Sequence, residues 1–404
     1  GIETSSNKED RGKLVIDEEA LKKALSENIE EVEFWYFIQY YFFKQWYNLK
    51  KHANNLGIEI IGDIPIYVAM DSADVWANVK YFQIDEKYNP INVAGCPPDD
   101  FTADGQLWGN PVYNYKSLEE DGYIWWIKRM QESLKMYDVV RIDHFRGFAG
   151  YFTIPFGDKT AHNGTWVEGP GYDLFKAVNE QLPGAQIIAE NLGFLDQSVH
   201  DLLDACGYPG MYIMHFDFGD GYDYSPLRDG LKTNNVIYTG THDNQTTRTW
   251  YDELNPHLTW CVNQYFGIND PSEAPLKIVE GTLKTTPDTA IIPLQDYLGL
   301  NDEQGRMNTP STLGCNWRYR CRRSDYNASL AHMMLEKYVK VANTYNAKLD
   351  NEEEIISNIN KTLSVKTEIE LTSNLDTNNL ARATFYYNFM NYSLLAGLVY
   401  VICL

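Results

Sequence analysis

The chain has 404 residues, 44% of them hydrophobic, which is enough to bury the core of one large α/β domain or of two ordinary ones. Its formal net charge of −22 argues against a polyanionic partner, because nucleic-acid phosphates are bound by clustered Lys and Arg side chains. The composition therefore predicts a globular protein without a nucleic-acid partner.

Neither end of the sequence carries the pattern of an export or membrane signal. Residues 1–13, GIETSSNKEDRGK, contain charges but no apolar core of the kind that a signal peptide has. The apolar run at 392–404 is shorter than the ~20 residues that a spanning helix needs. The six cysteines are scattered and form no close pair. We therefore expect a cytoplasmic protein without a membrane anchor.

Predicted helices and strands alternate along most of the chain. Residues 31–55 are rich in aromatic side chains and lack Pro and Gly, and they predict a long helix that ends just before Gly57. A buried strand follows, and after a Gly- and Pro-rich loop residues 117–136 predict a second helix and 137–143 a second strand. Later segments repeat this alternation, with helices at 171–181 and 196–205 and strands at 186–190, 211–216, 235–239 and 290–294. Repeated βα units of this kind imply a parallel sheet.

Three of these predicted strands have acidic residues at their carboxyl ends: Asp143, Glu190 and, just past the strand at 235–239, Asp243. In a (β/α)₈ TIM barrel the carboxyl ends of the strands carry the active site. A doubly wound sheet also gathers residues at its strand ends, but the Gly-rich phosphate loop typical of that fold is missing. We predict an α/β fold of the (β/α)₈ type. About six strands can be counted from Ile58 onward, so we expect an incomplete barrel that lacks its first two strands.

Three regions are expected along the chain. Residues 1–30 form a charged leader, 31–320 the catalytic barrel, and 321–404 a helical C-terminal extension of unknown role, with helices expected at 331–345 and 352–363.

The acidic residues have the chemistry to break a glycosidic bond with retention, which requires a carboxylate nucleophile and a carboxylic acid about 5–5.5 Å apart. Asp143 lies in RIDHFRG, two residues after Arg141, whose guanidinium on the same face of the strand would keep the carboxylate ionised. Glu190 lies in IIAENLG, where partial burial would raise its pKa and keep it protonated as the acid. Asp243, in TGTHDNQT, could hydrogen-bond sugar hydroxyls, and His242 offers a further donor.

Other interpretations of these residues remain open from the residues alone. An acidic residue at a strand end is often a capping feature, and Glu190 could be a charge at the amino end of a helix. His144 and His242 are metal-ligand types, but the close His pairing of the common zinc motifs is absent. A serine hydrolase would need a Gly-x-Ser-x-Gly turn, which the sequence lacks. We expect neither a metal nor an organic cofactor.

Several motifs occur in the order found in one enzyme family. Residues 62–76, GDIPIYVAMDSADVW, resemble the region of the third barrel strand in amylomaltases, the disproportionating 4-α-glucanotransferases of the α-amylase clan. Residues 93–115 are similar to the loop that covers the glucan groove in that family. RIDHFRG, AENLG and GTHDN follow, and RMNTPSTLGCNWRYR at 306–320 is similar to the family's closing signature. The resemblance extends over about residues 34–320.

This resemblance implies a TIM barrel of the α-amylase type with helical insertions, and a retaining enzyme that transfers α-1,4-glucan segments. Asp143 would attack the anomeric carbon, Glu190 would protonate the leaving sugar, and Asp243 would stabilise the transition state. The resemblance also implies a set of substrate-binding residues: Arg141, His242, Asp99, Trp108, Gly109, Asn110, Asp63 and Tyr67. Packing within the loop is an equally simple role for Trp108.

Some features depart from the family pattern. Asn191 and Gln245 stand where the family would have Asp, and each replacement removes a charge near the expected site. The carboxylates serve hydrolysis as well as transfer, so an α-glucan hydrolase is an alternative, and an inactive glucan-binding fragment is another. In all three cases the expected partners are α-1,4-glucans and maltooligosaccharides.

Overall fold

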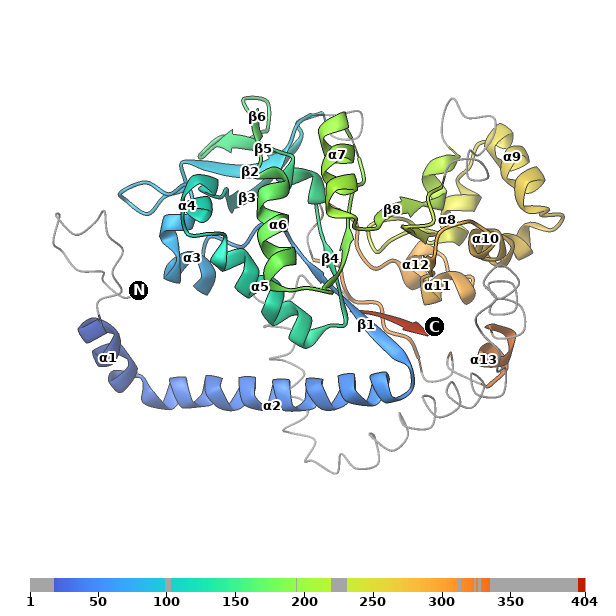
Figure 1. Cartoon of the computed structure of the whole chain (residues 1–404). Helices are drawn as coiled ribbons and strands as arrows, with labels where there is room; N and C mark the ends of the chain where they lie inside the picture. Colours follow the sequence, from blue (N-terminus) through green and yellow to red (C-terminus); the bar gives the residue numbers. More distant parts are fainter. Residues whose placement is uncertain are drawn as a thin grey trace. The chain divides into compact units, whose positions relative to one another are not determined.

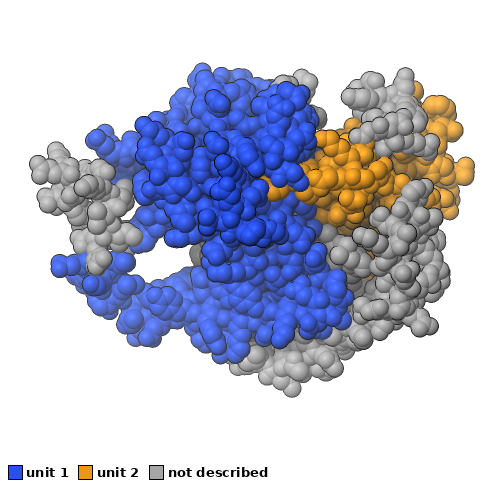
Figure 2. Space-filling view, viewed as in Figure 1, with its two compact units in different colours: residues 1–207, 380–404 blue, residues 208–379 orange. Residues whose placement is uncertain are grey.

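The protein is described by a computed structural model that covers residues 18–98, 103–193, 195–218, 231–310, 312, 314–322, 325, 328–334 and 399–403. The chain divides into two compact units (Figure 2). Unit 1 contains residues 1–207 and 380–404, and unit 2 contains residues 208–379.

Unit 1 begins with the helices α1 (Glu18–Glu27) and α2 (Ile29–Asn55), of which α2 is the longer (Figure 1). The second half of α2 is fixed to the chain before the second parallel strand. The Trp46 indole N–H donates a hydrogen bond to the Met136 carbonyl at 2.8 Å, and Lys50 Nζ lies 3.2 Å from Asp138 Oδ1. Gly57 follows with a φ of +75°, a left-handed conformation that favours glycine after a helix end. The prediction of a helix at 31–55 is confirmed.

Three strands of unit 1 pair in parallel: β1 (Ile58–Ile64), β4 (Val139–Ile142) and β7 (Gln186–Ala189), with β4 in the centre. All four residues of β4 are buried, as expected for a parallel strand that is covered on both faces. The far edge of β1 pairs antiparallel with β11 (Val399–Cys403), a strand that the sequence analysis did not predict.

The helices of unit 1 connect these strands, as the βα pattern predicts. Helix α6 (Gly171–Gln181) has the predicted bounds, and α7 (Gln197–Cys206) lies within one residue of its prediction. The single helix predicted at 117–136 is wrong, because the chain forms α4 (Tyr115–Glu120) and then α5 (Ile124–Met136). Gly122 and Tyr123 separate them with φ angles of +63° and +56°, and no right-handed helix continues through such angles.

A second sheet of unit 1 replaces much of the predicted loop at 93–115. Its order is β3 (Gln106–Pro111), β2 (Asn92–Cys96), β5 (Gly150–Pro155) and β6 (Thr165–Glu168), all antiparallel. The glycines of this segment, which predicted a loop, permit close pairing instead. A Cβ on Gly95 would lie 2.1 Å from the Gln106 carbonyl oxygen. The remaining short elements of unit 1 are α3 (Ala73–Ala77), η1 (Val79–Tyr81) and η2 (Phe145–Phe148).

Unit 2 continues the βα pattern. Its parallel strands are β8 (Gly210–Ile213), β9 (Asn235–Tyr238) and β10 (Thr289–Ile291), in the order β10-β9-β8. The strand predicted at 211–216 is shorter, because the 3₁₀ turn η3 (Met214–Asp217) replaces its end. Within the described residues the two units thus hold the six parallel strands that the sequence predicts.

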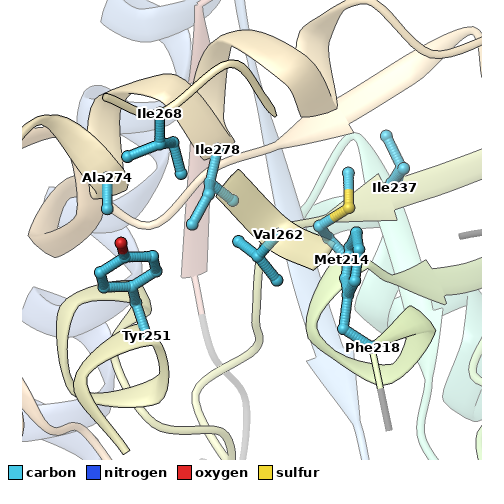
Figure 3. Close-up of a cluster of buried hydrophobic side chains, with 8 residues drawn as sticks. All are labelled: Met214, Phe218, Ile237, Tyr251, Val262, Ile268, Ala274 and Ile278. Atoms are coloured by element: carbon cyan, nitrogen blue, oxygen red, sulfur yellow. The ribbon is translucent and has the colours of Figure 1, made fainter. Parts of the chain in front are cut away.

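Helices α8 (Thr247–Asp252), α9 (Pro256–Phe266) and α10 (Ala274–Leu283) supply buried side chains to the core of unit 2. The other described helical elements after β9 are η5 (Pro271–Glu273), α11 (Leu294–Tyr297), α12 (Asp302–Gly305) and α13 (Ala328–Met334). Figure 3 shows the buried cluster, in which Met214 of η3 lies between Val262 of α9 and Ile237 of β9. The helix predicted at 331–345 overlaps α13, and its remainder and the helix predicted at 352–363 lie outside the described residues. None of the described helices has both the length and the apolar character of a membrane span.

Candidate active site

Two acidic side chains occupy equivalent positions on neighbouring strands of unit 1. The parallel pairing of β4 and β7 aligns Ile142 with Ala189, and the next residue on each strand is Asp143 or Glu190. The Glu190 N–H donates to the Ile142 carbonyl at 3.0 Å, so the pairing continues to the point where the carboxyl groups emerge. The structure therefore brings Asp143 and Glu190 together at the carboxyl edge of the sheet, where the sequence placed them.

Arg141 lies between two carboxylates. Its side chain is only 3% exposed, and its guanidinium forms ion pairs with Asp63 on β1 and with Asp143, the latter at 2.9 Å. The Asp63 side chain is 4% exposed, whereas that of Asp143 is 43% exposed. The ion pair with the guanidinium fixes the position of the Asp143 carboxylate, and its exposure leaves it open to a substrate.

Glu190 differs from Asp143 because it is 9% exposed. Burial raises its pKa from 4.5 to about 7, and the charge of Asp143 adds to the rise, while Arg141 and two backbone N–H groups oppose it. Those N–H groups belong to Leu192, 2.6 Å from Oε1, and to His144, 2.7 Å from Oε2. The predicted rise in pKa is confirmed, and Glu190 carries its proton for about half of the time near neutral pH.

His144 has a structural part in this site that the sequence did not predict. Its φ of +53° turns the chain after Asp143, and this turn directs the His144 N–H to the Glu190 carboxyl and the Phe145 N–H to the Glu190 carbonyl. Burial lowers the pKa of the His144 imidazole to about 4, so the ring is neutral at physiological pH. Its edge-to-face contact with Trp108, at a centroid distance of 4.9 Å, joins β3 to the carboxyl pair.

The other predicted substrate-binding residues of unit 1 lie around Trp108. Gly109 has a φ of +79°, and Asn110 Nδ2 donates to the Val68 carbonyl at 3.0 Å, which fixes β3 next to the chain after β1. Tyr67 is 5% exposed and stacks on Tyr113, and its ring centroid lies 6.3 Å from that of Trp108. Asp99 lies outside the described residues.

In unit 2, Asp243 and His242 lie in the turn between β9 and α8. His242 Nε2 is 3.2 Å from Asp243 Oδ2, and Asn308 Nδ2 donates to Asp243 Oδ1 at 2.5 Å. The backbone around Asp243 is fixed as well, because Arg306 Nη2 donates to its carbonyl at 2.8 Å. Sequence reasoning missed Asn308 and Arg306, although both lie in the signature at 306–320.

Two buried or half-buried aspartates hold the ends of this turn. Asp296 is 1% exposed and accepts hydrogen bonds from the Thr239 hydroxyl at 2.5 Å and from the Thr247 N–H at 2.8 Å. Asp302 accepts from the Thr246 N–H at 2.7 Å and pairs with Arg306 at 3.0 Å. Both ends of the turn are therefore tied to the segment after β10, which fixes where Asp243 projects.

The two departures from the family pattern have different surroundings. Gln245 donates to Glu253 at 2.7 Å, and an Asp at this position would instead face another carboxylate. Asn191 follows Glu190 directly and is half-buried. Among the described residues, no group of three or more His, Cys, Asp or Glu side chains is placed to hold a metal ion.

Parallel strands that alternate with helices and carry a carboxyl pair at their carboxyl ends are the arrangement of the (β/α) barrel proteins. The family model described as 4-alpha-glucanotransferase matches residues 7–325. The chain belongs to this 4-alpha-glucanotransferase family.

Individual proteins that are similar to this chain carry the same description. The 4-alpha-glucanotransferase of Clostridium butyricum is 42% identical over 316 residues, which are 78% of this chain and 65% of the relative. That of Streptococcus pneumoniae strain TIGR4 is 44% identical over 299 residues, 74% of this chain and 59% of the relative. The chain thus spans less than two thirds of the length of these relatives.

The solved structure of the amylomaltase from Streptococcus agalactiae in complex with acarbose is similar to this chain with a TM-score of 0.77 and 37% identity. The likeness covers 83% of this chain and 67% of that structure. It confirms the predicted α/β fold class.

Proposed function

We propose that this chain is a retaining 4-α-glucanotransferase that moves α-1,4-glucan segments to glucose or maltodextrin acceptors. The observation that carries the proposal is the pair of carboxyl groups on neighbouring strands, one exposed beside Arg141 and the other buried with a raised pKa. The retaining mechanism needs a carboxylate nucleophile and a carboxylic acid, and the raised pKa of Glu190 suits it to the part of the acid.

In the first step, an Asp143 oxygen attacks the anomeric carbon of the donor glucan while the glycosidic bond breaks. Glu190 gives its proton to the departing glycosidic oxygen, so the leaving sugar departs as a neutral alcohol. The product is a glucosyl ester on Asp143. Arg141 supports this step because its ion pair holds the Asp143 carboxylate in place for the attack.

In the second step, the acceptor's hydroxyl group attacks the same carbon. Glu190 now takes the proton of that hydroxyl, the ester bond breaks, and Asp143 returns as a carboxylate. A pKa of about 7 suits a group that must give a proton in one step and take one in the next. Asp243 and His242 would hydrogen-bond the sugar hydroxyls as the ring flattens.

Transfer rather than hydrolysis requires that an acceptor sugar reaches the ester before water does. Strand β3 supports this part of the proposal, since it places Trp108 against His144, directly after the nucleophile. We assign Trp108, Gly109 and Asn110 to glucan contacts on this ground, and we assign Asp99 to the same role on the family resemblance alone. Asp63 contributes to substrate binding indirectly, through its ion pair with Arg141. Tyr67 contributes through its ring contact with Trp108. The substrates would be cytoplasmic maltodextrins.

The test is to incubate the purified chain with maltotriose and to separate the products by chromatography, with Asp143→Asn as the control. Glucose together with longer maltodextrins, absent with Asp143→Asn, is the expected result. Glucose and maltose without longer products would show a hydrolase instead. A folded sample that binds maltodextrins without any turnover would overturn the proposal and favour a glucan-binding fragment.

A further inference from the structure

Trp317 of unit 2 has a conformation that bulky side chains rarely adopt. Its φ is +63°, in the left-handed region that glycine favours, and its backbone N–H donates to the Met307 carbonyl at 2.7 Å. Asn316 holds the preceding loop, because its side chain accepts from the Thr309 N–H at 3.1 Å and donates to the Thr312 carbonyl at 3.1 Å. The surrounding loop therefore maintains an unfavourable backbone angle at Trp317. Unfavourable backbone angles of this kind are found most often at functional sites.

The position of the indole ring shows what this conformation achieves. The ring lies 5.2 Å from the His242 ring, at an interplanar angle of 39°, and His242 in turn contacts Asp243. Trp317 remains 44% exposed and is not part of the buried cluster of unit 2. Core packing therefore does not explain a tryptophan here, while a partly open ring beside a polar side chain that itself contacts a carboxylate is a feature of ligand sites.

We propose that Trp317 is a stacking platform for a glucose unit of the glucan, next to Asp243 and His242. This inference rests on the proposed function. The apolar C–H face of a glucose ring would lie on the exposed part of the indole, and its hydroxyls would be directed to the neighbouring polar groups. Asn308 links the two halves of the platform, since its N–H donates to the His242 carbonyl at 3.0 Å and its side chain donates to Asp243.

The backbone angle of Trp317 allows a clean variant. Trp317→Gly removes the ring and suits a φ of +63°, so it preserves the loop better than any other truncation. Trp317→Phe keeps an aromatic face. Trp260→Ala is the matched control, because Trp260 is 59% exposed on α9 of the same unit.

The experiment measures maltoheptaose binding by calorimetry in the Asp143→Asn background, and kcat and KM with maltotriose in the active chain. We expect Trp317→Gly to weaken binding about ten-fold, near the upper end for a lost aromatic contact, and to raise KM more than it lowers kcat. Trp317→Phe should recover most of the affinity, and Trp260→Ala should bind as the parent does.

Each outcome decides one question. If the parent chain binds and turns over glucan but Trp317→Gly has unchanged affinity and KM, the platform is refuted and the proposed function stands. If Trp317→Gly lowers kcat and the unfolding temperature while leaving affinity unchanged, the ring has a structural role and the platform is again refuted. If the parent chain neither binds nor transfers glucan, the proposed function fails, and the platform fails with it.

Discussion

The raised pKa of Glu190 predicts a dependence of stability on pH that can be measured without any substrate. Glu190→Gln is the perturbation, because glutamine has nearly the same shape and does not titrate. Glutamine has one oxygen, whereas the carboxyl group accepts from both Leu192 and His144. The variant therefore loses part of one hydrogen bond at every pH, and this constant offset is separate from the effect of titration.

The sign and size of the change in stability follow from the pKa of Glu190 in the unfolded chain and in the folded chain. Below 4.5 the carboxyl group is protonated in both the folded and the unfolded chain, and the folded state has its full stability. Above 4.5 the unfolded chain loses the proton while the folded chain keeps it until about pH 7, so stability falls through this range and then levels off. The full shift corresponds to about 3 kcal/mol, and about 2 kcal/mol of it falls between about pH 5.5 and pH 8.

Urea unfolding of the parent and of Glu190→Gln, measured across that pH range, tests this. The free energy of unfolding of the parent should fall relative to the variant by about 2 kcal/mol, and the fall should level off near pH 7. In Asp143→Asn the levelling-off should move to lower pH, because the charge of Asp143 contributes to the raised pKa of Glu190. Parallel pH curves for parent and Glu190→Gln would refute the reasoning, since Glu190 would then not titrate in this range.

Three further results are expected. The kcat/KM for maltotriose should decline above about pH 7, measured by a pH profile, because Glu190 then lacks the proton that the leaving sugar needs. Arg141→Met should lower the free energy of unfolding by about 3–5 kcal/mol in a urea titration, because it removes the guanidinium that pairs with the buried Asp63 carboxylate. Asn308→Ala should lower kcat by about ten-fold with a smaller effect on KM in steady-state assays, because Asp243 loses the donor that orients it.

Matched changes separate these effects from general damage. Lys135→Met removes an ion pair with Glu132 in which both side chains are more than half exposed, and it should cost at most about 1 kcal/mol. Asn255→Ala removes one side-chain hydrogen bond, to the Leu258 N–H at the start of α9 in the same unit, without touching Asp243. An Arg141→Met chain as stable as Lys135→Met, or an Asn255→Ala chain as impaired in kcat as Asn308→Ala, would contradict the respective prediction.

The local sequence pattern was sufficient to predict the parallel strands and the positions of the acidic residues at their ends. Apolar runs such as VVRI and QIIA predict strands because parallel strands are buried on both faces. The residue that follows such a run then lies at the carboxyl edge of the sheet. The same logic predicted that Arg141 would contact Asp143, since they are two residues apart on one strand. Burial of Glu190 followed from its place at the end of β7.

The remainder of the site depends on backbone angles and on contacts between distant residues. A left-handed His144 cannot be told from an ordinary one by its neighbours in the sequence, yet this angle directs its N–H to Glu190. Asn308 lies 65 residues from Asp243 along the chain, so no local pattern reports their hydrogen bond. The antiparallel pairing of β2 with β3 was missed because Gly and Pro hid the strand pattern, although glycine is what permits the close approach.

Asp143 and Glu190 occupy equivalent positions on neighbouring strands, so one edge of the sheet supplies two carboxyl groups with different chemistry. Parallel register alone fixes the separation of their backbones, and this leaves their chemistry to be set by what covers each side chain. Asp143 is exposed and contacts Arg141, whereas Glu190 is buried beneath the turn at His144. Because the charge of Asp143 also raises the pKa of Glu190, neutralising the nucleophile in the glucosyl ester would lower that pKa. Formation of the ester would thereby favour the ionised Glu190 that the second step needs as its base.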